Sequence, residues 1–497
     1  MNDNTLSIEN ETCGQFREKP EYTKADSVIS AVVMIAAFCF IRYVLFHAMG
    51  FITTGIFAAF ITAAMIYLRK KGCEFSGFNK LLTVILYVFS IVFSITANDF
   101  IKVLDAMFLF GAGAYMIYSV GAGNSTLEKF LPFAMVKAIF EYPFANFGAQ
   151  GRVTSDVISD SKIGKNIRLI VLGLIVTIPL TAIVAALLMS ADSGVEMMLK
   201  GLFSGSDNEE FWNIVVQIIF TIPLSMYIFG MFYTNTHCEA ERRLDERRCI
   251  EKIFNMRFVS NLVCYTAVTP MCLLYVLFFI SQGKYFLSAF TDSLPEGFTY
   301  SDYARRGFFE LCAIAVINLG VLCFISLHSK KAGREKPLAL KLYSVVLSVF
   351  TLILIATAMS KMVMYIRRYG LTELRLYTSW FILLLAAVFV LIIIKQFRFD
   401  MKFAKHISVI FTLMFAVLCF SRPEALIAKY NIEMYKSGYL DELDKDDLLY
   451  MSDDSRLTAL VNGVVTEEEV NDHKYSGYEG ESYGRYNLSS VILDSMT

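Results

Sequence analysis

The stretch from Leu374 to Ile394, LRLYTSWFILLLAAVFVLIII, decides the fold class of this chain. Arg375 is its one charged residue, and most of the other side chains are large and apolar. A helix rises about 1.5 Å per residue, so about 20 such residues cross the roughly 30 Å of hydrocarbon in a bilayer. The stretch is therefore long and apolar enough to be a transmembrane helix.

Similar stretches recur along the chain, so the sequence predicts an all-α, polytopic transmembrane bundle of about eleven spans. Of the 497 residues, 56% are apolar or aromatic and 18% are charged, and the mean hydropathy is +0.53. Soluble domains carry about a quarter charged residues, so the composition excludes an ordinary soluble enzyme. The net charge of −1 gives no support for a nucleic-acid partner. The other predicted spans are Val28 to His47, Gly50 to Leu68, Leu81 to Ala97, Ile101 to Val120, Ile167 to Met189, Phe211 to Phe232, Phe258 to Ile280, Gly307 to Leu327, Leu338 to Met362 and Phe403 to Phe420.

Basic residues are distributed unevenly between the spans. Most of the 45 Lys and Arg residues lie in alternate segments, at residues 17–24, 69–80, 129–168, 242–257, 330–341 and 395–405. Lys and Arg are retained on the cytoplasmic side, so these segments predict a cytoplasmic amino terminus and an extracytoplasmic carboxyl terminus.

This topology divides the chain into three regions. Residues 1–27 are expected to be a cytoplasmic segment without the basic start of a cleavable signal peptide, so the first span stays as an anchor. Residues 28–420 form the transmembrane bundle. Residues 421–497 form an acidic extracytoplasmic tail, helical to about residue 463 and disordered beyond it.

Two long segments on the predicted cytoplasmic side have helical patterns. Residues 121–166 contain an amphipathic stretch, which indicates either a helix lying in the membrane interface or one packed on the inner face of the bundle. Residues 237–254 mix acidic and basic side chains at helical spacing, which is typical of a solvated helix and offers a surface for a cytoplasmic protein partner.

The ten cysteines do not indicate a disulfide framework, because none lies in a predicted outer loop. His237, Cys238 and Cys249 lack the paired spacing and the fourth ligand of a zinc site. We therefore predict no metal and no cofactor.

Polar groups and prolines inside the spans are candidates for function, because ionisable groups in a membrane are costly. Arg42 and Asp105 lie toward the outer ends of two spans, where they are expected to form an ion pair, either as a functional site or as a structural link between helices. Pro179, Pro223 and Pro270 lie in mid-span and predict helix kinks. Paired interruptions of this kind point to transporter sites, although isolated kinks are also common in membrane helices.

Two predicted outer loops carry arginines. Those of the second loop, Arg367, Arg368 and Arg375, break the positive-inside rule, so a compensating negative group is expected outside the membrane. An anionic lipid headgroup or a small anionic solute would meet this need, and so would a structural salt-bridge network. The candidate binding residues of this outer cluster are Arg305, Arg306, Glu310, Arg367, Arg368 and Arg375.

The same two loops carry a family resemblance. From Gly297 the chain reads GFTYSDYARRGFFEL, and from Tyr365 it reads YIRRYGLTELR. The tail adds Arg422-Pro423, Tyr430-Asn431-Ile432 and Gly438 to Leu440. With these motifs the chain resembles a bacterial family of polytopic membrane proteins catalogued as a domain of unknown function. The resemblance implies the architecture and no activity.

We interpret the sequence as a transporter-like protein of the bacterial plasma membrane with an outward-facing charged cluster. A membrane sensor or scaffold of the bacterial envelope is the alternative. An envelope enzyme acting on a lipid-linked substrate ranks last, because the chain has no HExxH, P-loop or GxSxG pattern.

Overall fold

The computed structural model describes residues 22–46, 48–158, 209–238, 244–290, 308–330, 337–398, 400–476 and 486–496, together with isolated positions between 177 and 198. Throughout this part of the chain the elements are helices, and an isolated bridge between Val259 and Ser329 is the exception. The predicted all-α class is confirmed.

Within the described residues, ten helices are long and apolar enough to cross a membrane. They match ten of the predicted spans, and the remaining span, 167–189, lies outside the described residues apart from isolated positions. The ten are α1 (Lys24–Phe40) with a π-helical turn (Ile41–Leu45), α2 (Phe51–Lys70), α3 (Gly77–Ser90) with α4 (Val92–Ile95), α5 (Asp99–Gly121), α11 (Glu209–His237), α13 (Asn261–Phe290), α15 (Phe308–His328), α16 (Leu338–Tyr369), α17 (Glu373–Phe397) and α18 (Phe403–Phe420).

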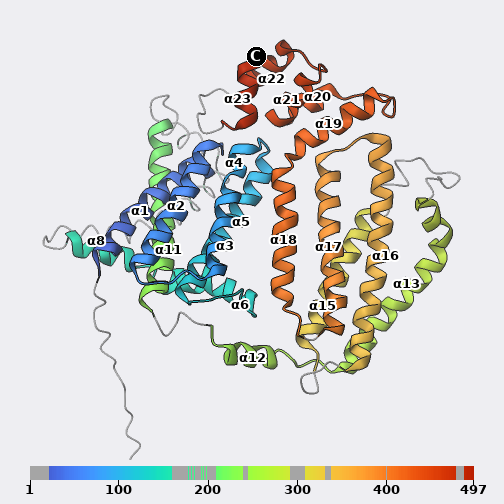
Figure 1. Ribbon diagram of the computed structural model, residues 1–497, viewed down its shortest axis with the longest axis horizontal. Coiled ribbons are helices and arrows are strands. Elements are labelled where there is room, and N and C mark those ends of the chain that lie inside the picture. Colours follow the sequence, from blue (N-terminus) through green and yellow to red (C-terminus); the bar gives the residue numbers. More distant parts are fainter. Residues whose placement is uncertain are drawn as a thin grey trace, which may run out of the picture.

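These helices form two bundles that stand side by side (Figure 1). The N-terminal bundle comprises α1 to α5 and α11, and the C-terminal bundle comprises α13, α15, α16 and α17. Helix α18 lies between them. Its Phe415 and Cys419 are buried in the N-terminal core, while Trp380 of α17 donates a hydrogen bond to the backbone oxygen of Met414 at 2.9 Å. Thus α18 joins the two bundles along a seam.

Short helices lie across one end of the N-terminal bundle: α6 (Leu131–Val136), a π-helical turn (Lys137–Glu141), α7 (Tyr142–Ala145) and α8 (Ala149–Ile158) (Figure 1). One face is buried through Ala134, Ala138 and Tyr142, whereas Phe140 and Phe144 are exposed. The segment therefore packs on the bundle, as one of the two interpretations predicts. Its exposed apolar face is also what an interfacial helix would place in lipid.

Helix α12 (Glu246–Asn255) connects the two bundles at this same end. Asp245 caps it by accepting hydrogen bonds from the backbone N–H groups of Arg247 and Arg248. Arg248 is exposed, in agreement with a solvated helix.

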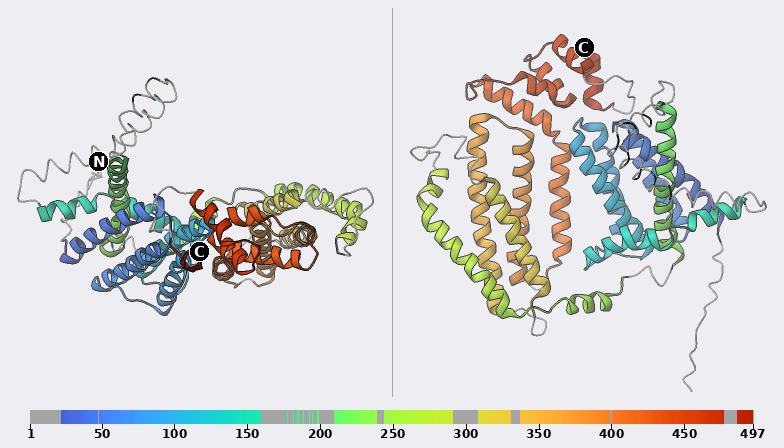
Figure 2. Two further views of the ribbon diagram at one scale, coloured as in Figure 1. Left: turned by 90° about the horizontal axis from the view of Figure 1, so that it is seen from above. Right: turned by 180° about the vertical axis from the view of Figure 1, so that it is seen from behind.

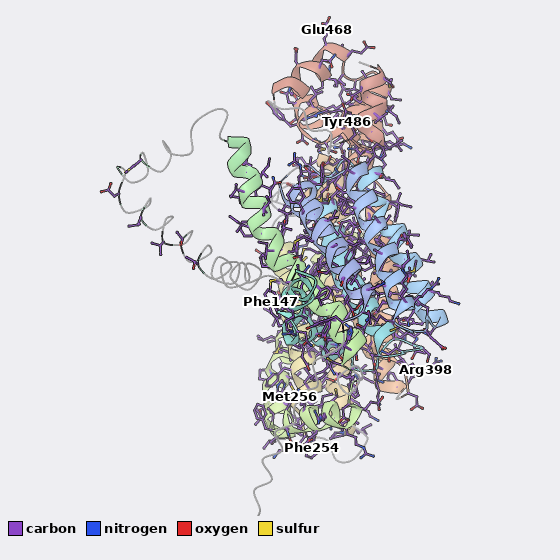
Figure 3. All side chains as sticks on the ribbon, turned by 90° about the vertical axis from the view of Figure 1, so that its left-hand side faces the viewer. Phe147, Phe254, Met256, Arg398, Glu468 and Tyr486 are labelled. Carbon is purple, nitrogen blue, oxygen red and sulfur yellow. The ribbon has the colours of Figure 1, made fainter. Side chains whose placement is uncertain are left out.

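The C-terminal tail folds into a small helical unit, the cap, over the opposite ends of both bundles (Figure 2). We call that side of the molecule the capped end and the other the basic end. In Figure 3, Glu468 and Tyr486 lie toward the capped end, and Phe254 and Met256 lie at the basic end. The cap contains α19 (Pro423–Lys436), α20 (Lys445–Tyr450), α21 (Asp453–Val461), α22 (Glu467–Ser476) and α23 (Leu488–Met496).

Helical order in the cap continues beyond residue 463, where the sequence predicts that it ends. Val470 of α22 and Leu493 of α23 are fully buried in the cap core with Ile432, Leu448 and Leu449. Val470 and Leu493 are therefore core positions of the cap, and burial of each side chain stabilises its helix by about 1.5–3 kcal/mol.

Candidate functional site

Helices α15, α16 and α17 enclose a cavity of about 250 Å³ at the capped end, which we call the capped-end cavity. Its wall is mostly apolar and aromatic, with three hydroxyl groups and one cation. The cavity lies where α15 begins and α16 ends. The lining residues are Phe308, Phe309, Met362, Tyr365, Thr372, Leu374, Arg375 and Thr378.

Arg375 is the cation of this wall, and three contacts fix its position. Its Nη1 donates hydrogen bonds to the backbone oxygens of Tyr369 at 2.9 Å and Gly370 at 2.5 Å. Its guanidinium carbon lies 4.1 Å from the centre of the Tyr365 ring. The bonded oxygens belong to the C-terminal end of α16, where a cation is favoured by the helix dipole. Within the described residues, Nε and Nη2 have no hydrogen-bond partner, so they can serve a ligand.

The turn between α16 and α17 is bound directly to the cap. Gly370 has a φ of +77°, which favours glycine. Asn431 of α19 accepts a hydrogen bond from the Leu371 N–H at 2.7 Å and donates one to the Leu371 oxygen at 2.8 Å. A Cβ added to Gly370 would lie 2.7 Å from Asn431 Oδ1. The segments around Gly370 and Asn431 therefore form one joint.

The structure places the other predicted cluster residues differently. Arg368 forms a 3.0 Å ion pair with Asp441 of the cap, and both side chains are exposed. Glu310 of α15 lies within electrostatic reach of Lys361 on α16. Arg305 and Arg306 lie outside the described residues. Of the six predicted residues, Arg375 lines the cavity and Arg368 forms an ion pair with the cap. That all six residues form one cluster stays a prediction.

The cap is fastened to the N-terminal bundle by a second group of polar residues, which we call the latch. Asp454 is fully buried and accepts hydrogen bonds from Arg422 Nε at 3.1 Å and Nη2 at 2.9 Å. It also accepts from Thr96 Oγ1 at 2.7 Å, the Ala97 N–H at 2.8 Å and Ser489 Oγ at 2.5 Å. One carboxylate thus joins α19, α23 and the connection between α4 and α5.

A carboxyl pair lies where the cap meets both bundles. Asn98, at the start of α5, donates through Nδ2 to Glu373 of α17 at 3.0 Å and also to Glu424 of α19. The backbone N–H of Ser452 donates to Glu424 at 2.8 Å. Burial of Glu424, together with its hydrogen bond to Glu373, raises the pKa of Glu424 to about 7. The contact of the cap with both bundles is therefore sensitive to protonation.

Asp105 of α5 does not form the predicted ion pair with Arg42. Its side chain is fully buried, and neither of its oxygens has a hydrogen-bond partner within the described residues. Arg42 lies in the π-helical turn after α1 and makes other interactions. Asp105 is thus a buried carboxyl group without a counter-ion among the residues that the structure describes.

Sequence reasoning missed a polar cluster at the basic end. The fully buried Asp26 of α1 accepts a hydrogen bond from Lys71 Nζ at 2.7 Å and one from the Tyr67 hydroxyl at 2.7 Å. His237 Nε2 of α11 lies 3.4 Å from the same carboxylate. The spacing of Thr23 and Asp26, typical of a helix start, was the one available signal. Because the partners lie on three separate spans, no local pattern joins them.

Two of the three predicted kink prolines lie inside described helices, Pro223 in α11 and Pro270 in α13, while Pro179 lies outside the described residues. Thr221 and Thr269 precede them and donate hydroxyl hydrogen bonds of 2.7 Å to backbone oxygens four residues earlier. Kinks at these sites stay a prediction.

One family model, described as Domain of unknown function (DUF4153), matches residues 82–460. That range runs from α3 to α21 and includes the capped-end cavity, Asp105 and most of the latch. No curated protein and no solved structure matches the chain.

Proposed function

This chain belongs to the family described as Domain of unknown function (DUF4153), and we propose that it is a transporter-like membrane protein that takes an amphipathic anion into the capped-end cavity. The family description names no activity, so we rest the proposal on one observation. Arg375 stands on an otherwise uncharged wall at the ends of three membrane helices, and its Nε and Nη2 are not bonded to other described residues.

The chemistry of the wall supports an amphipathic anion. A guanidinium group binds phosphate or carboxylate oxygens with two parallel hydrogen bonds. The Phe308, Phe309 and Tyr365 rings offer the apolar surface that the first carbons of an attached chain require. At about 250 Å³ the cavity lies just below the usual range of ligand pockets, so it fits a headgroup and the start of its chain rather than a whole lipid.

We place the capped end outside a bacterial plasma membrane and the basic end in the cytoplasm. Support comes from the arginine and lysine residues of segments 69–80, 244–257 and 395–405, which lie at the basic end. Two arginines at the capped end have local partners: Arg375 donates hydrogen bonds to backbone oxygens, and Arg368 forms an ion pair with Asp441.

Movement of a fluorescent anionic phospholipid tests the proposal. Proteoliposomes would carry tail-labelled phosphatidylglycerol, and dithionite would bleach the label in the outer leaflet. We expect the wild-type protein to bring the inner-leaflet label to the bleach, and Arg375→Gln to reduce the rate by at least about tenfold, the equivalent of one strong charge-assisted hydrogen bond.

Three comparisons keep the flux test specific. Thr378→Leu fills the cavity wall and leaves Arg375 in place, so it should slow the flux as well. Arg368→Gln removes an exposed pair at the same end and should not change it. Labelled phosphatidylcholine should move more slowly than phosphatidylglycerol. Equal bleaching of wild-type and protein-free liposomes would refute lipid transport by this protein.

The cap supports a sensor as a second candidate function. Glu424 and Asn98 connect it to both bundles, so movement of the cap would change how the bundles meet. A sensor requires a cytoplasmic partner at α12, where Arg248 is exposed. A photo-crosslinker at Arg248 should then join the protein to one recurrent partner in cells, and recovery of the protein alone would argue against this function.

A further inference from the structure

Asp105 occupies an unusual position in the N-terminal bundle. It lies on α5, about one and a half turns from the start of that helix, and its side chain has no solvent-exposed surface. Both of its oxygens lack hydrogen-bond partners within the described residues. Buried polar groups are nearly always bonded, so an unbonded carboxyl group requires a specific explanation.

The surroundings of Asp105 are apolar on the side of α18. Phe108, one turn further along α5, packs on Phe89 with ring centres 4.5 Å apart and on Phe415 of α18 at 5.4 Å. The titratable group facing Asp105 from α18 is Cys419, which is fully buried. Asp105 therefore lies at the seam where α18 joins the two bundles.

Cations on the same helix do not pair with Asp105. Lys102 lies one turn before it and is almost fully buried, but its ammonium group is 3.6 Å from Asp99 Oδ1. Asp99 itself is exposed at the capped end. An ionised Asp105 would thus be an unpaired charge in a low-dielectric interior, which costs several kcal/mol.

A bound proton neutralises the Asp105 carboxylate more readily than a metal ion does. Metal cations such as Ca²⁺ and Mg²⁺ require about six oxygen ligands. In the part of the chain that the structure describes, no group of three or more His, Cys, Asp or Glu side chains could hold a metal ion. One isolated carboxyl group meets the needs of a proton, which forms a single O–H bond.

We propose that Asp105 is a proton-binding site inside the membrane region and that the closed seam between α5 and α18 keeps its carboxyl group protonated. The proton comes from water when the seam closes and returns to water when the seam opens. This site lies apart from the capped-end cavity, and its proton binding does not depend on a ligand there. Reversible protonation at a seam between bundles is the step that a proton-coupled change of conformation requires.

Infrared spectroscopy of the purified protein in lipid nanodiscs tests the proposal directly. The spectrum of the wild type minus that of Asp105→Asn should contain a carbonyl band of a neutral carboxylic acid at neutral pH. Above the titration midpoint, the band should fall about tenfold per pH unit. Asp99→Asn, an exposed aspartate of the same helix, should leave the band unchanged.

Either of two infrared results would overturn the proposal: a carboxylate band at neutral pH in place of the acid band, or loss of the acid band on adding Na⁺ at constant pH. Thermal unfolding provides a second measurement. Asp105→Asn should unfold at the same temperature as the wild type or higher, because no bond is lost. A lower melting temperature would show that Asp105 is a structural partner of another group.

Discussion

Asp454 accepts hydrogen bonds from three separate parts of the chain and has no exposed surface. The exposed pair of Arg368 and Asp441 also joins the cap to a bundle, at nearly the same distance of 3.0 Å. Burial decides their relative strength, because exposed pairs contribute about 0–1 kcal/mol and breaking a buried pair costs about 3–5 kcal/mol.

Asp454→Asn should therefore release the cap. We expect the free energy of cap docking to fall by about 3–5 kcal/mol, because Arg422 keeps its charge and loses its partner. Hydrogen exchange of α21 and α23 would report the change as faster exchange. Asp441→Asn is the matched control, and it should change the free energy of cap docking by less than about 1 kcal/mol. Equal effects of the two substitutions would contradict the latch.

Gly370 allows a second comparison of single residues. Gly370→Ala should destabilise the protein more than Gly438→Ala, although both glycines have left-handed φ values, +77° and +72°. Both substitutions incur the same backbone strain of about 1 kcal/mol, but the new Cβ at 370 also meets Asn431. The difference in melting temperature measures the close contact alone. Equal losses would show that the Asn431 joint contributes little.

For single residues, the sequence indicated which side chains to consider, but it did not predict the contacts that they make. Arg375 was singled out by its breach of the positive-inside rule, and it does line the capped-end cavity. Its bonds to the end of α16 could not be inferred, since they depend on the turn at Gly370. Asp105 was identified from its cost in a membrane, but the partner assigned to it, Arg42, does not reach it.

Helix α19 is the element that connects the cap to both bundles, through Glu424. Burial raises the pKa of Glu424 to about 7, above the ordinary carboxyl value of about 4.3. The docked cap therefore binds this proton more tightly than the undocked or unfolded chain does. By linkage, the stability of docking is fully present below about pH 4 and falls as the pH rises toward 7.

We expect the free energy of cap docking to fall between pH 5 and 8 by an amount on the order of 3 kcal/mol at most, so the cap should unfold at a lower temperature at pH 8 than at pH 5. Glu424→Gln should remove most of this dependence, because glutamine does not titrate. Glu442→Gln, at an exposed position of the cap, is the control. A pH dependence unchanged in Glu424→Gln would refute the role of Glu424.

Element positions were predictable where hydropathy is high, and their ends were not. Helix α18 has the predicted bounds, whereas α16 continues from the predicted end at Met362 to Tyr369. A hydropathy window detects where the hydrocarbon ends, but the helix ends at the next residue that breaks it, here Gly370. Helices α22 and α23 were missed because they are short, and packing of Val470 and Leu493 in the cap core holds them in place.

At the scale of the whole molecule, the two bundles meet at α18 and beneath the cap. Asn98, Glu373 and Glu424 are far apart in the chain, yet one side-chain amide joins them. No local pattern predicts such a contact, because it depends on three elements packing together. The contact couples the cap to both bundles. Asp105 lies at the seam and Arg375 at the mouth of the C-terminal bundle.

Binding of an anionic headgroup at Arg375 is tested most directly by a high-resolution cryo-electron microscopy map of the protein in phosphatidylglycerol nanodiscs. We expect density for an anionic headgroup in the capped-end cavity, within hydrogen-bond distance of Arg375 Nε or Nη2, and no such density in Arg375→Gln. A map in which the wild-type cavity is empty and both nitrogens bind other groups of the chain would contradict the proposed function.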